Sequence, residues 1–229
     1  MGELVFPPRD LVTVAVDGKD KRFPVNRIFC VGQNYAAHAR EMGGDPARTP
    51  PFFFSKFPDA IAPNGAVIPY PPLTANFHHE VELVVALSGE GFAVSAAEAD
   101  GLIFGYAVGL DMTRRDLQAA AKKQGQPWDF AKNFPYSAPI GVIREKAVAG
   151  TPGNAAITLT VNGDTRQNST TADMIRSVPE IIVELSKAYH LYPGDLIYTG
   201  TPEGVGAVAR GDVLHATVAG LPALSVTIG

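Results

Sequence analysis

The sequence predicts a mixed α/β fold that is rich in β-strands and organised as one compact domain. The chain has 229 residues, a length at which a single core is the natural arrangement. Its 23 glycines and 19 prolines separate short β-type segments instead of forming one linker. Hydrophobic residues make up 46% and charged residues 18%, and the formal net charge is −4, which excludes a disordered chain and a basic nucleic-acid binder.

The N-terminal part of the chain predicts a hairpin followed by a buried strand. Thr13–Val16 alternates between two faces, Asp17-Gly18 is a turn signal, and Arg22–Val25 is the returning strand. Ile28–Val31 is a short apolar run that ends at Gly32, which indicates a buried strand.

The following segments predict a short helix and then irregular extended structure. Asn34–Met42 indicates a helix with Asn34 as its N-cap, and Gly43-Gly44 is its stop signal. From Pro50 to Pro72, prolines and aromatic residues predict short extended pieces joined by turns.

Two apolar segments in the middle of the chain, Val81–Leu87 and Ile103–Leu110, predict the strongest strands. Between them, Ser95–Asp100 indicates the start of a helix with a capping box made by Ser95 and Glu98. Thr113–Lys123 predicts a helix directly after the second strand.

The C-terminal third predicts a hairpin, a helix and three closing strands. The turn Asn162-Gly163 follows the strand Ile157–Val161 and is a hairpin signal. Ser177–His190 is amphipathic, and Pro179 falls in its first turn, where proline is tolerated. The closing strands are Leu196–Thr199, Val213–Val218 and Leu224–Ile228.

Two glutamates stand at the start of the first strong strand. Because side chains alternate along a strand, Glu80 and Glu82 point the same way, while Val81 and Leu83 lie on the opposite, buried face. Two carboxylates about 4 Å apart repel by about 4 kcal/mol at an effective dielectric constant of about 20. A shared proton, exposure to solvent or a bound metal ion are the three ways in which the strand can carry them.

A third carboxylate, Asp111, follows the second strong strand. Asp111 is either the N-cap of the next helix or a ligand that joins Glu80 and Glu82. Three oxygen ligands, without a cysteine or histidine spacing typical of zinc, favour a hard cation such as Mg²⁺ or Mn²⁺.

Three further polar side chains are candidates for the site, Arg115 and Gln118 for substrate binding and Lys132 for catalysis. Arg115 and Gln118 are three residues apart and therefore share one helix face just after Asp111. Arg115 either forms a bidentate ion pair with a substrate carboxylate or pairs with a surface acid, Asp116 or Glu98. Lys132 lies among aromatic residues. The composition of this segment alone favours a lysine side chain that extends to solvent over one directed into a polar pocket.

Taken together, these residues resemble the fumarylacetoacetate hydrolase family, in particular its short, single-domain acylpyruvase (fumarylpyruvate hydrolase) branch. The resemblance covers roughly residues 26–229, and it depends on five motifs in the family's order. They are Val31–Tyr35 with His38 and Glu41, His79–Leu83, Gly109–Asp111 with Arg115, Asp116 and Gln118, Pro127-Trp128 with Ala131-Lys132, and Tyr198–Gly206.

The resemblance implies a fold and a metal site. The fold is a β-roll with flanking short helices. The metal ligands are Glu80, Glu82 and Asp111, which hold Mg²⁺ or Mn²⁺, with Ca²⁺ as a substitute in crystals. The 2-keto acid end of the substrate completes the coordination of the ion.

The resemblance also implies roles for six further residues. Lys132 matches the family lysine near the metal, and Arg115, Gln118 and Thr201 match substrate-contacting positions. His38 and Glu41 match a water-activating pair on a mobile lid. We therefore expect the segment 34–44 to be loosely ordered without ligand and to close over it, with Gly43-Gly44 as a hinge.

The implied reaction is the hydrolysis of an acylpyruvate, a 2,4-diketo acid, to pyruvate and a carboxylic acid. Fumarylpyruvate is the favoured substrate, because four cations could meet its second carboxylate: Lys56, Arg114, Lys122 and Lys123. Decarboxylation of oxaloacetate, or isomerisation and decarboxylation of a muconate-type diacid, is the nearest alternative. A non-catalytic 2-keto acid binding protein is the alternative from a different class.

The expected setting is a cytoplasmic homodimer that binds neither nucleic acid nor membrane. The single cysteine, Cys30, lies in an apolar run and is interpreted as a buried residue in a reducing compartment. The N-terminus shows no signal peptide pattern. Residues 1–25 are expected to form a short hairpin region and residues 26–229 the catalytic domain.

Overall fold

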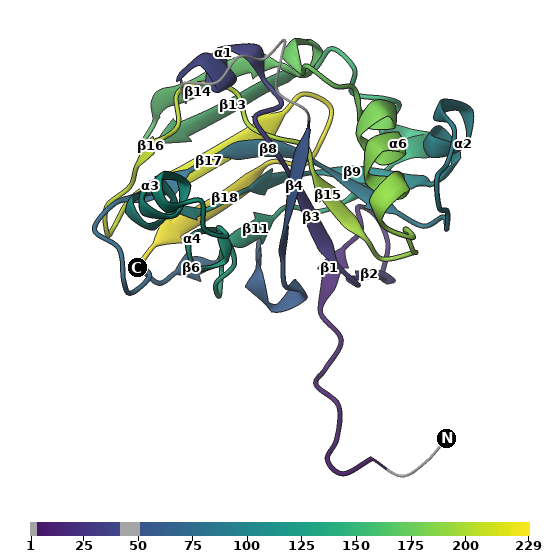
Figure 1. The fold of residues 1–229 in the computed structure, drawn as a ribbon, viewed down its shortest axis with the longest axis horizontal. Helices are drawn as coiled ribbons and strands as arrows, with labels where there is room; N and C mark the ends of the chain where they lie inside the picture. The colour runs from purple at the N-terminus through teal and green to yellow at the C-terminus, as the bar shows by residue number, and fades with distance from the viewer. Residues whose placement is uncertain (1–3, 42–50) are drawn as a thin grey trace.

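A large mixed sheet forms the frame of the molecule in the computed structural model, which describes residues 4–41 and 51–229 (Figure 1). Its strands run in the order β4 (Phe52–Lys56), β3 (Ile28–Gly32), β15 (Leu196–Tyr198), β8 (Val81–Leu87), β9 (Ile103–Leu110), β11 (Ala138–Ile140) and β5 (Ile61–Pro63), with β12 (Arg144–Glu145) paired beside β9.

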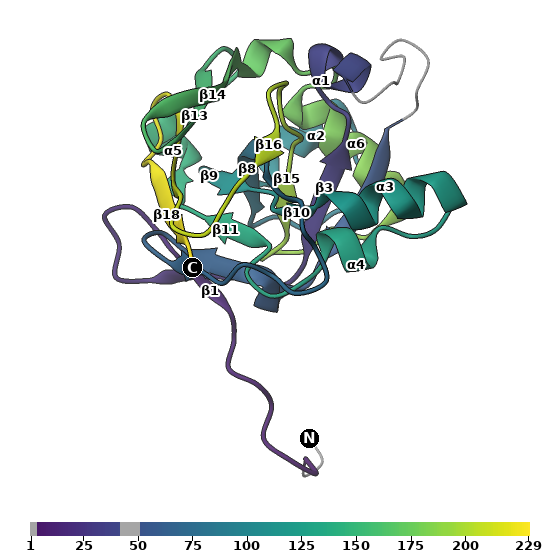
Figure 2. The same ribbon diagram turned by 90° about the vertical axis from the view of Figure 1, so that its left-hand side faces the viewer.

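A second sheet and two small ones complete the β-structure. The second sheet has the order β14 (Asp164–Thr170), β13 (Ala156–Val161), β17 (Val213–Val218), β18 (Leu224–Ile228) and β6 (Val67–Ile68). The small sheets are β10 (Thr113–Arg114), β7 (Phe77–His79) and β16 (Gly206–Ala207), and the hairpin β1 (Thr13–Ala15) with β2 (Arg22–Pro24). Figure 2 shows the strands curled around a common centre, which confirms the predicted strand-rich α/β fold.

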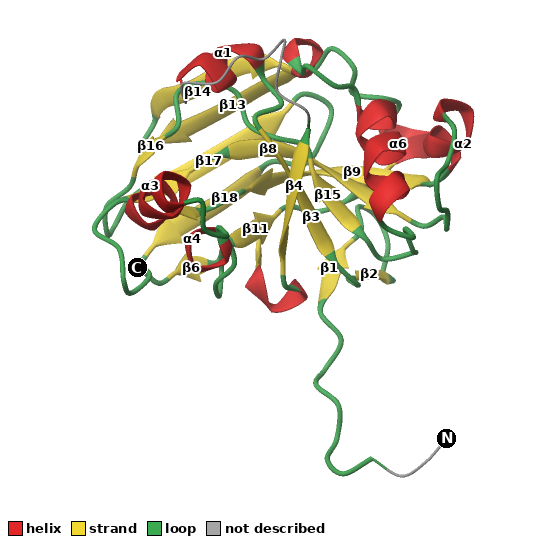
Figure 3. Ribbon diagram, in the orientation of Figure 1, coloured by secondary structure: helices red, strands yellow, loops and turns green. Residues whose placement is uncertain are grey.

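The helices are short and lie at the edges of the sheets (Figure 3). The described helices are α1 (Ala36–Glu41), α2 (Ala96–Gly101), α3 (Arg115–Gln124), α4 (Asp129–Lys132), α5 (Lys146–Ala149) and α6 (Val178–Ala188), with 3₁₀ turns at Pro58–Ala60 and Thr171–Asp173. Helix α2 packs against α6, and α3 packs against α4 on the opposite side (Figure 1). None of the described helices is long and apolar enough to cross a membrane.

Both faces of the large sheet are buried, and this explains why all seven residues of β8 are apolar or enclosed. Val81, Leu83 and Val85 join the core that lies between the two large sheets. Val84 and Ala86 point to the other face, where they join a second core built with the N-terminal hairpin. A strand covered on both sides reads as a continuous apolar run instead of an alternating one.

The pairing of β8 with β9 brings the three candidate carboxylates to one face. The two strands are antiparallel, with Val81 opposite Leu110 and Glu82 opposite Gly109. The backbone N–H of Asp111 donates to the carbonyl oxygen of Glu80 at 2.9 Å, which extends this register by one residue. Since side chains alternate, Glu80, Glu82 and Asp111 project from the same face at adjacent strand ends.

The local turn and capping signals are confirmed. Asn162 and Gly163 have φ angles of 53° and 89°, as a tight hairpin turn between β13 and β14 requires. Ser95 and Glu98 form the expected capping box of α2. Helix α6 begins after Ser177, which forms a second capping box with Glu180, and it ends at Ala188, two residues before the predicted boundary.

Two of the predicted helix starts are wrong. Thr113 and Arg114 were expected at the start of a helix. They instead form the strand β10, which pairs with β7, and helix α3 begins at Arg115. The side chain of Asn34, expected to cap the first helix, is used elsewhere. It donates to the carbonyl oxygens of Arg176 and Thr199 and accepts from the N–H of Arg176.

Candidate metal centre and active site

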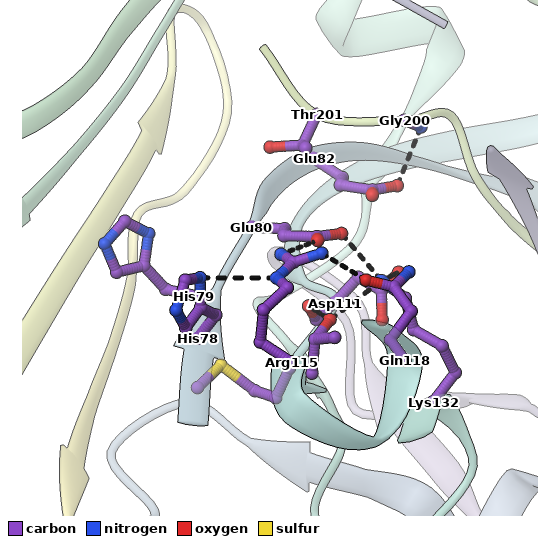
Figure 4. Close-up of polar contacts among 12 residues, drawn as sticks. His78, His79, Glu80, Glu82, Asp111, Arg115, Gln118, Lys132, Gly200 and Thr201 are labelled. Atoms are coloured by element: carbon purple, nitrogen blue, oxygen red, sulfur yellow. Dashed lines mark hydrogen bonds and ion pairs between the residues drawn. The ribbon is translucent and has the colours of Figure 1, made fainter. Parts of the chain in front are cut away.

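The three carboxylates predicted to bind a metal converge in the structure (Figure 4). One oxygen from each of Glu80, Glu82 and Asp111 lies within 4.8 Å of the others. The three residues are only 4%, 2% and 1% exposed, so solvent does not screen their mutual repulsion. Exposure to solvent, one of the three ways in which the strand could carry them, is thereby excluded.

Three cations from three different elements equal the three carboxylates in formal charge, but they pair only with Glu80 and Asp111. Lys132 on α4 donates to Glu80 Oε2 at 2.8 Å and to Asp111 Oδ2 at 2.7 Å. Arg115 at the start of α3 is ion-paired with Glu80 Oε1. Lys56 on β4 lies 2.8 Å from Asp111 Oδ1. The composition-based interpretation of Lys132 as a lysine that extends to solvent is therefore wrong, since it is 2% exposed.

The burial of Lys56 and Arg114 contradicts their predicted role as cations for a second substrate carboxylate. The side chain of Lys56 is fully buried beneath the site, where Nζ also donates to the carbonyl oxygens of Met112 and Lys132. Arg114 donates to the carbonyl oxygen of Phe130, and its guanidinium lies 4.2 Å from the centre of the Phe134 ring. Both cations are thus engaged within the fold.

The remaining two of those cations lie on the surface beside the site. Lys122 and Lys123 line a cavity of about 560 Å³ together with Glu41, Arg115 and Gln118. Their proposed contact with a second carboxylate stays a prediction.

Charge is distributed unevenly among the carboxylates. Burial alone would raise the pKa of Glu80, but the cations of Lys132 and Arg115 outweigh it and hold that pKa below its usual range. Burial, with the negative charges of Asp111 and Glu80, raises the pKa of Glu82 well above its usual value of 4.5. Glu82 makes no ion pair with a described residue, and its main polar contact is the backbone N–H of Gly200 at 2.7 Å.

The donor set fits a hard divalent cation. All three groups offer oxygen, the ligand that Mg²⁺ and Mn²⁺ prefer. Asp111 Oδ1, although close to Lys56, accepts no hydrogen bond of good geometry, and Glu82 lacks a cationic partner among the described residues. A cation between these oxygens would give both groups a positively charged partner.

Eight of the nine predicted site residues line one cavity of about 30 Å³. They are His38, Glu80, Glu82, Asp111, Arg115, Gln118, Lys132 and Thr201. The ninth, Glu41, contacts the first of them: its Oε2 lies 3.1 Å from Nδ1 of His38 across one turn of α1. The predicted hinge at Gly43-Gly44 lies outside the described residues.

Arg115 is held in place by neighbours on both sides (Figure 4). Its Nε donates to Nδ1 of His78 at 3.3 Å, and Nη1 donates to Oε1 of Gln118. Burial and the charge of Arg115 lower the pKa of His78 to about 4, so the ring is neutral near pH 7 and can accept this bond. The other ring nitrogen of His78 bonds to Asn76 at 2.8 Å.

Two residues that build the site have roles that were not predicted from sequence: Lys56 was expected to meet a substrate carboxylate, and Gln167 was not a candidate. Lys56 is joined to Asp111 across the sheet, and Gln167 on β14 is hydrogen-bonded to both His79 and Thr201. Neither residue belongs to a local pattern, since each partner lies more than 30 positions away. Gly200, whose N–H donates to Glu82, lies within the Tyr198–Gly206 motif.

Replacing Lys56 by methionine is expected to destabilise the metal-free protein. Removing one member of a buried ion pair costs about 3–5 kcal/mol, because the other charge stays buried without compensation. For a chain of this size, the melting temperature should fall by roughly 6–20 °C. Added Mn²⁺ should recover part of the loss, since it restores positive charge beside Asp111.

Calorimetry or thermal denaturation with and without metal measures this effect. Lys123→Met is the matched control, because this lysine is exposed on α3 and its loss should change stability by less than about 0.5 kcal/mol. Equal melting temperatures for Lys56→Met and wild type would contradict the interpretation.

Residues 27–229 match the family described as fumarylacetoacetate (FAA) hydrolase, C-terminal. The fumarylpyruvate hydrolase of Ralstonia sp. is 49% identical over 179 residues, which cover 78% of this chain and 92% of that protein. The mitochondrial oxaloacetate tautomerase FAHD1 of Homo sapiens is 42% identical over 201 residues, which cover 88% and 90%.

A solved structure matches nearly the whole chain. The crystal structure of fumarylpyruvate hydrolase from Pseudomonas aeruginosa in complex with Mn²⁺ and pyruvate superposes with a TM-score of 0.97 and 47% identity, covering 99% of each chain.

Proposed function

Because the chain belongs to the fumarylacetoacetate hydrolase family, we propose that it is a metal-dependent hydrolase of acylpyruvates. It cleaves the carbon–carbon bond of a 2,4-diketo acid, with fumarylpyruvate favoured, to give pyruvate and a carboxylic acid. The observation that carries this proposal is the convergence of Glu80, Glu82 and Asp111 in one cavity with His38. The similarity to two fumarylpyruvate hydrolases supports the choice of substrate.

In this proposal Glu80, Glu82 and Asp111 hold Mg²⁺ or Mn²⁺. When bound, the ion supplies Lewis-acid stabilisation for the negative charge that develops on the pyruvate portion of the substrate. The Mn²⁺ in the Pseudomonas aeruginosa structure supports this choice of metal.

Three side chains orient the keto acid. Arg115 presents a guanidinium fixed by Glu80 and His78, which suits a carboxylate or carbonyl oxygen. Gln118 lies one turn further along α3 and supplies an amide. Thr201 lines the same cavity from the loop after β15 and offers a hydroxyl.

His38 acts as the general base on water. Glu41 holds its Nδ1, which leaves Nε2 to accept a proton from the water that attacks the distal carbonyl. The bond between C3 and C4 then breaks, its electron pair stays on the pyruvate fragment, and the proton taken up by His38 is available for C3.

Lys132 supplies a fixed positive charge. Burial alone would lower its pKa, but Asp111 and Glu80 outweigh burial and raise that pKa above its usual value, so the side chain stays an ammonium. As a charged donor at the wall of the cavity, it stabilises oxyanion character on the substrate.

Oxaloacetate tautomerisation is a second candidate function. Several curated relatives with this name are 40–44% identical to the chain over more than four-fifths of its length. The same cavity would bind the keto acid portion of oxaloacetate, with His38 moving a proton at C3. Decarboxylation of oxaloacetate and reactions of muconate-type diacids stay predictions.

A substrate panel tests the proposal. Purified protein, stripped with chelator and reloaded with Mg²⁺ or Mn²⁺, is assayed for pyruvate release from fumarylpyruvate and acetylpyruvate, and for loss of the enol absorbance of oxaloacetate. We expect fumarylpyruvate to be cleaved with the highest kcat/KM and only with metal. Faster consumption of oxaloacetate enol than of fumarylpyruvate would favour the tautomerase, and oxalate binding without any turnover would favour a non-catalytic binder.

The setting of the enzyme completes the proposal. We expect a homodimer in the cytoplasm that uses Mg²⁺, with residues 1–25 as an N-terminal hairpin region and residues 26–229 as the catalytic domain. Light scattering of the metal-loaded protein measures the oligomeric state directly.

A further inference from the structure

A second cavity adjoins the metal centre and is much larger. Its volume is about 490 Å³, against about 30 Å³ for the cavity of the three carboxylates. The two cavities share four lining residues, Phe52, Phe54, Trp128 and Lys132. The acyl arm of a keto acid bound to the proposed ion can therefore extend directly into this larger cavity, which we call the aromatic cleft.

Three aromatic side chains form the wall where the two cavities meet. The Phe52 ring meets Trp128 edge-on with 5.1 Å between ring centres, and Phe54 lies 5.9 Å from the same indole. Gly32, which is paired with Phe52 across β3 and β4, leaves room for the phenyl ring. A Cβ at Gly32 would lie 2.0 Å from Cζ of Phe52, so the ring covers the glycine backbone directly.

The aromatic cleft offers π faces rather than a counter-ion. Among the described residues that line it, Lys132 is the only cation and Asp129 the only anion. Lys132 is already ion-paired with Glu80 and Asp111. A flat acyl group can stack on or pack edge-on against the phenyl and indole rings, an interaction that adds to simple burial of apolar area.

We propose that the aromatic cleft is the subsite for the acyl arm and that it selects planar, conjugated or aromatic acyl groups. Aroylpyruvates then belong to the substrate range together with fumarylpyruvate, whose double bond lies against the rings while its distal carboxylate extends into solvent. This inference rests on the proposed function, because the metal centre must hold the keto acid end.

The ratio of kcat/KM for benzoylpyruvate to that for acetylpyruvate tests the subsite. Phe52→Leu should lower this ratio about five- to tenfold, because the leucine keeps apolar volume but loses the aromatic face. Trp128→Leu should act in the same direction. Phe130→Leu is the matched control: this phenylalanine is 77% exposed on α4, outside the aromatic cleft, and its loss should leave the ratio within twofold.

An unchanged ratio in both cleft variants, with both substrates still turned over, would overturn the subsite and leave the proposed function standing. A loss of fumarylpyruvate selectivity in Lys123→Met would also overturn it, because the acyl arm would then lie along α3. If the Mn²⁺-loaded wild type cleaves no acylpyruvate, the proposed function itself fails.

A separate observation concerns Gln167, whose side-chain amide has every hydrogen-bonding position occupied. Oε1 accepts from the backbone N–H of Val81 and from Nδ1 of His79, both at 3.0 Å. Nε2 donates to the carbonyl oxygen of Pro202 at 2.9 Å and to Oγ1 of Thr201 at 2.8 Å. Gln167 is 1% exposed and crosses from the five-stranded sheet to the strand that carries the carboxylates.

Two backbone groups fix which way this amide points. The N–H of Val81 can only donate and the carbonyl of Pro202 can only accept, so the amide oxygen must face the first and the nitrogen the second. Nε2 then has one remaining hydrogen, which goes to Oγ1 of Thr201. The Thr201 hydroxyl therefore acts as an acceptor toward Gln167, and its own hydrogen must be directed elsewhere.

We infer that Gln167 is a positioning residue that commits the Thr201 hydroxyl to donate into the active-site cavity. Among the described residues, the hydroxyl makes no other hydrogen bond, and Thr201 lines the cavity with 3% exposure. An anionic carboxylate of the keto acid is the acceptor that this donor suits. The inference rests on the proposed function only in that a keto acid binds beside Thr201.

A double-mutant cycle isolates this effect. Gln167→Glu keeps the acceptor for Val81 and His79 but replaces the donor to Thr201 by a second oxygen, which draws the hydroxyl hydrogen away from the cavity. We expect the dissociation constant of oxalate with the Mn²⁺-loaded protein to rise about tenfold and KM to rise with it, while kcat changes less. In a Thr201→Val background the same substitution should change oxalate affinity less than twofold.

Thr201→Ser, which keeps the hydroxyl, should preserve the full Gln167→Glu effect. Equal effects of Gln167→Glu in the wild-type and Thr201→Val backgrounds would show a purely structural role and overturn the inference. Failure of oxalate to bind the Mn²⁺-loaded wild type would instead contradict the proposed function.

Discussion

Glu82→Gln is expected to lower metal-dependent turnover strongly and, without metal, to make the protein more stable. The glutamine keeps the shape and the acceptor for the N–H of Gly200, but it removes the buried negative charge that has no cationic partner among the described residues. Weaker stabilisation of transition-state charge should lower kcat roughly 10³-fold at saturating substrate.

The effect on stability has a definite sign. Wild type in Mn²⁺ at 100 times its dissociation constant gains about 2.7 kcal/mol, and the variant should gain much less. Without metal, the raised pKa of Glu82 means that the folded protein binds a proton more tightly than the unfolded chain does. The stability contribution of Glu82 is therefore fully present below pH 4.5 and is lost as pH rises toward the folded-state pKa.

Thermal denaturation between pH 4 and 8, with Mn²⁺ or with chelator, measures both effects. The metal-free wild type should lose stability relative to Glu82→Gln as pH rises. Glu90→Gln, which removes an exposed carboxylate far from the site, is the matched control and should behave as wild type. Retained turnover in Glu82→Gln with metal supplied would show that the metal mechanism is wrong.

His38→Gln is expected to lower kcat by about 10²–10⁴ while oxalate and Mn²⁺ still bind. General-base catalysis contributes this range, and glutamine can keep a hydrogen bond to Glu41 but cannot accept a proton from water near neutral pH. Because His38 is not among the oxygen cluster that would hold the ion, the metal dissociation constant should change little.

Glu41→Gln should give a smaller loss, since it weakens the orientation of His38 without removing the ring. His215→Gln serves as the matched control, because this histidine is exposed on β17 and its side chain bonds only to Ser225 among the described residues. Steady-state kinetics with fumarylpyruvate and calorimetric titration of oxalate separate kcat from binding. An equal loss in oxalate affinity and in kcat would assign His38 to substrate binding rather than to proton transfer.

Local signals in the sequence predicted much of the architecture. The Asn162-Gly163 turn and the Ser95 capping box depend on residues within four positions of each other, and both occur as expected. The alternation of Glu80 and Glu82 also follows from strand geometry alone. The family motifs then placed Asp111 with them, and the structure brings all three within ion-binding distance.

The features of the site that could not be predicted from the sequence depend on contacts between residues that are far apart along the chain. A lysine among aromatic residues normally extends to solvent, because a buried ammonium is costly to desolvate. Lys132 is buried instead because it pairs with Glu80, just before β8, and with Asp111, just after β9, and Lys56 is buried because it pairs with Asp111. These pairs can be foreseen only when the strand order and register are known. The same holds for Gln167, whose four partners lie on two other segments.

The strand order of the large sheet has a consequence for how such an enzyme diversifies. The three carboxylates proposed to hold the ion stand on or directly beside the middle strands, β8 and β9, whereas Phe52 and Phe54 belong to β4 at the rim. Rim residues are half-buried, so exchanging them should change which acid enters at a modest cost in folding free energy. Chemistry and selectivity can therefore evolve separately, because residues of the edge strand can be substituted while the carboxylates of the central strands are kept.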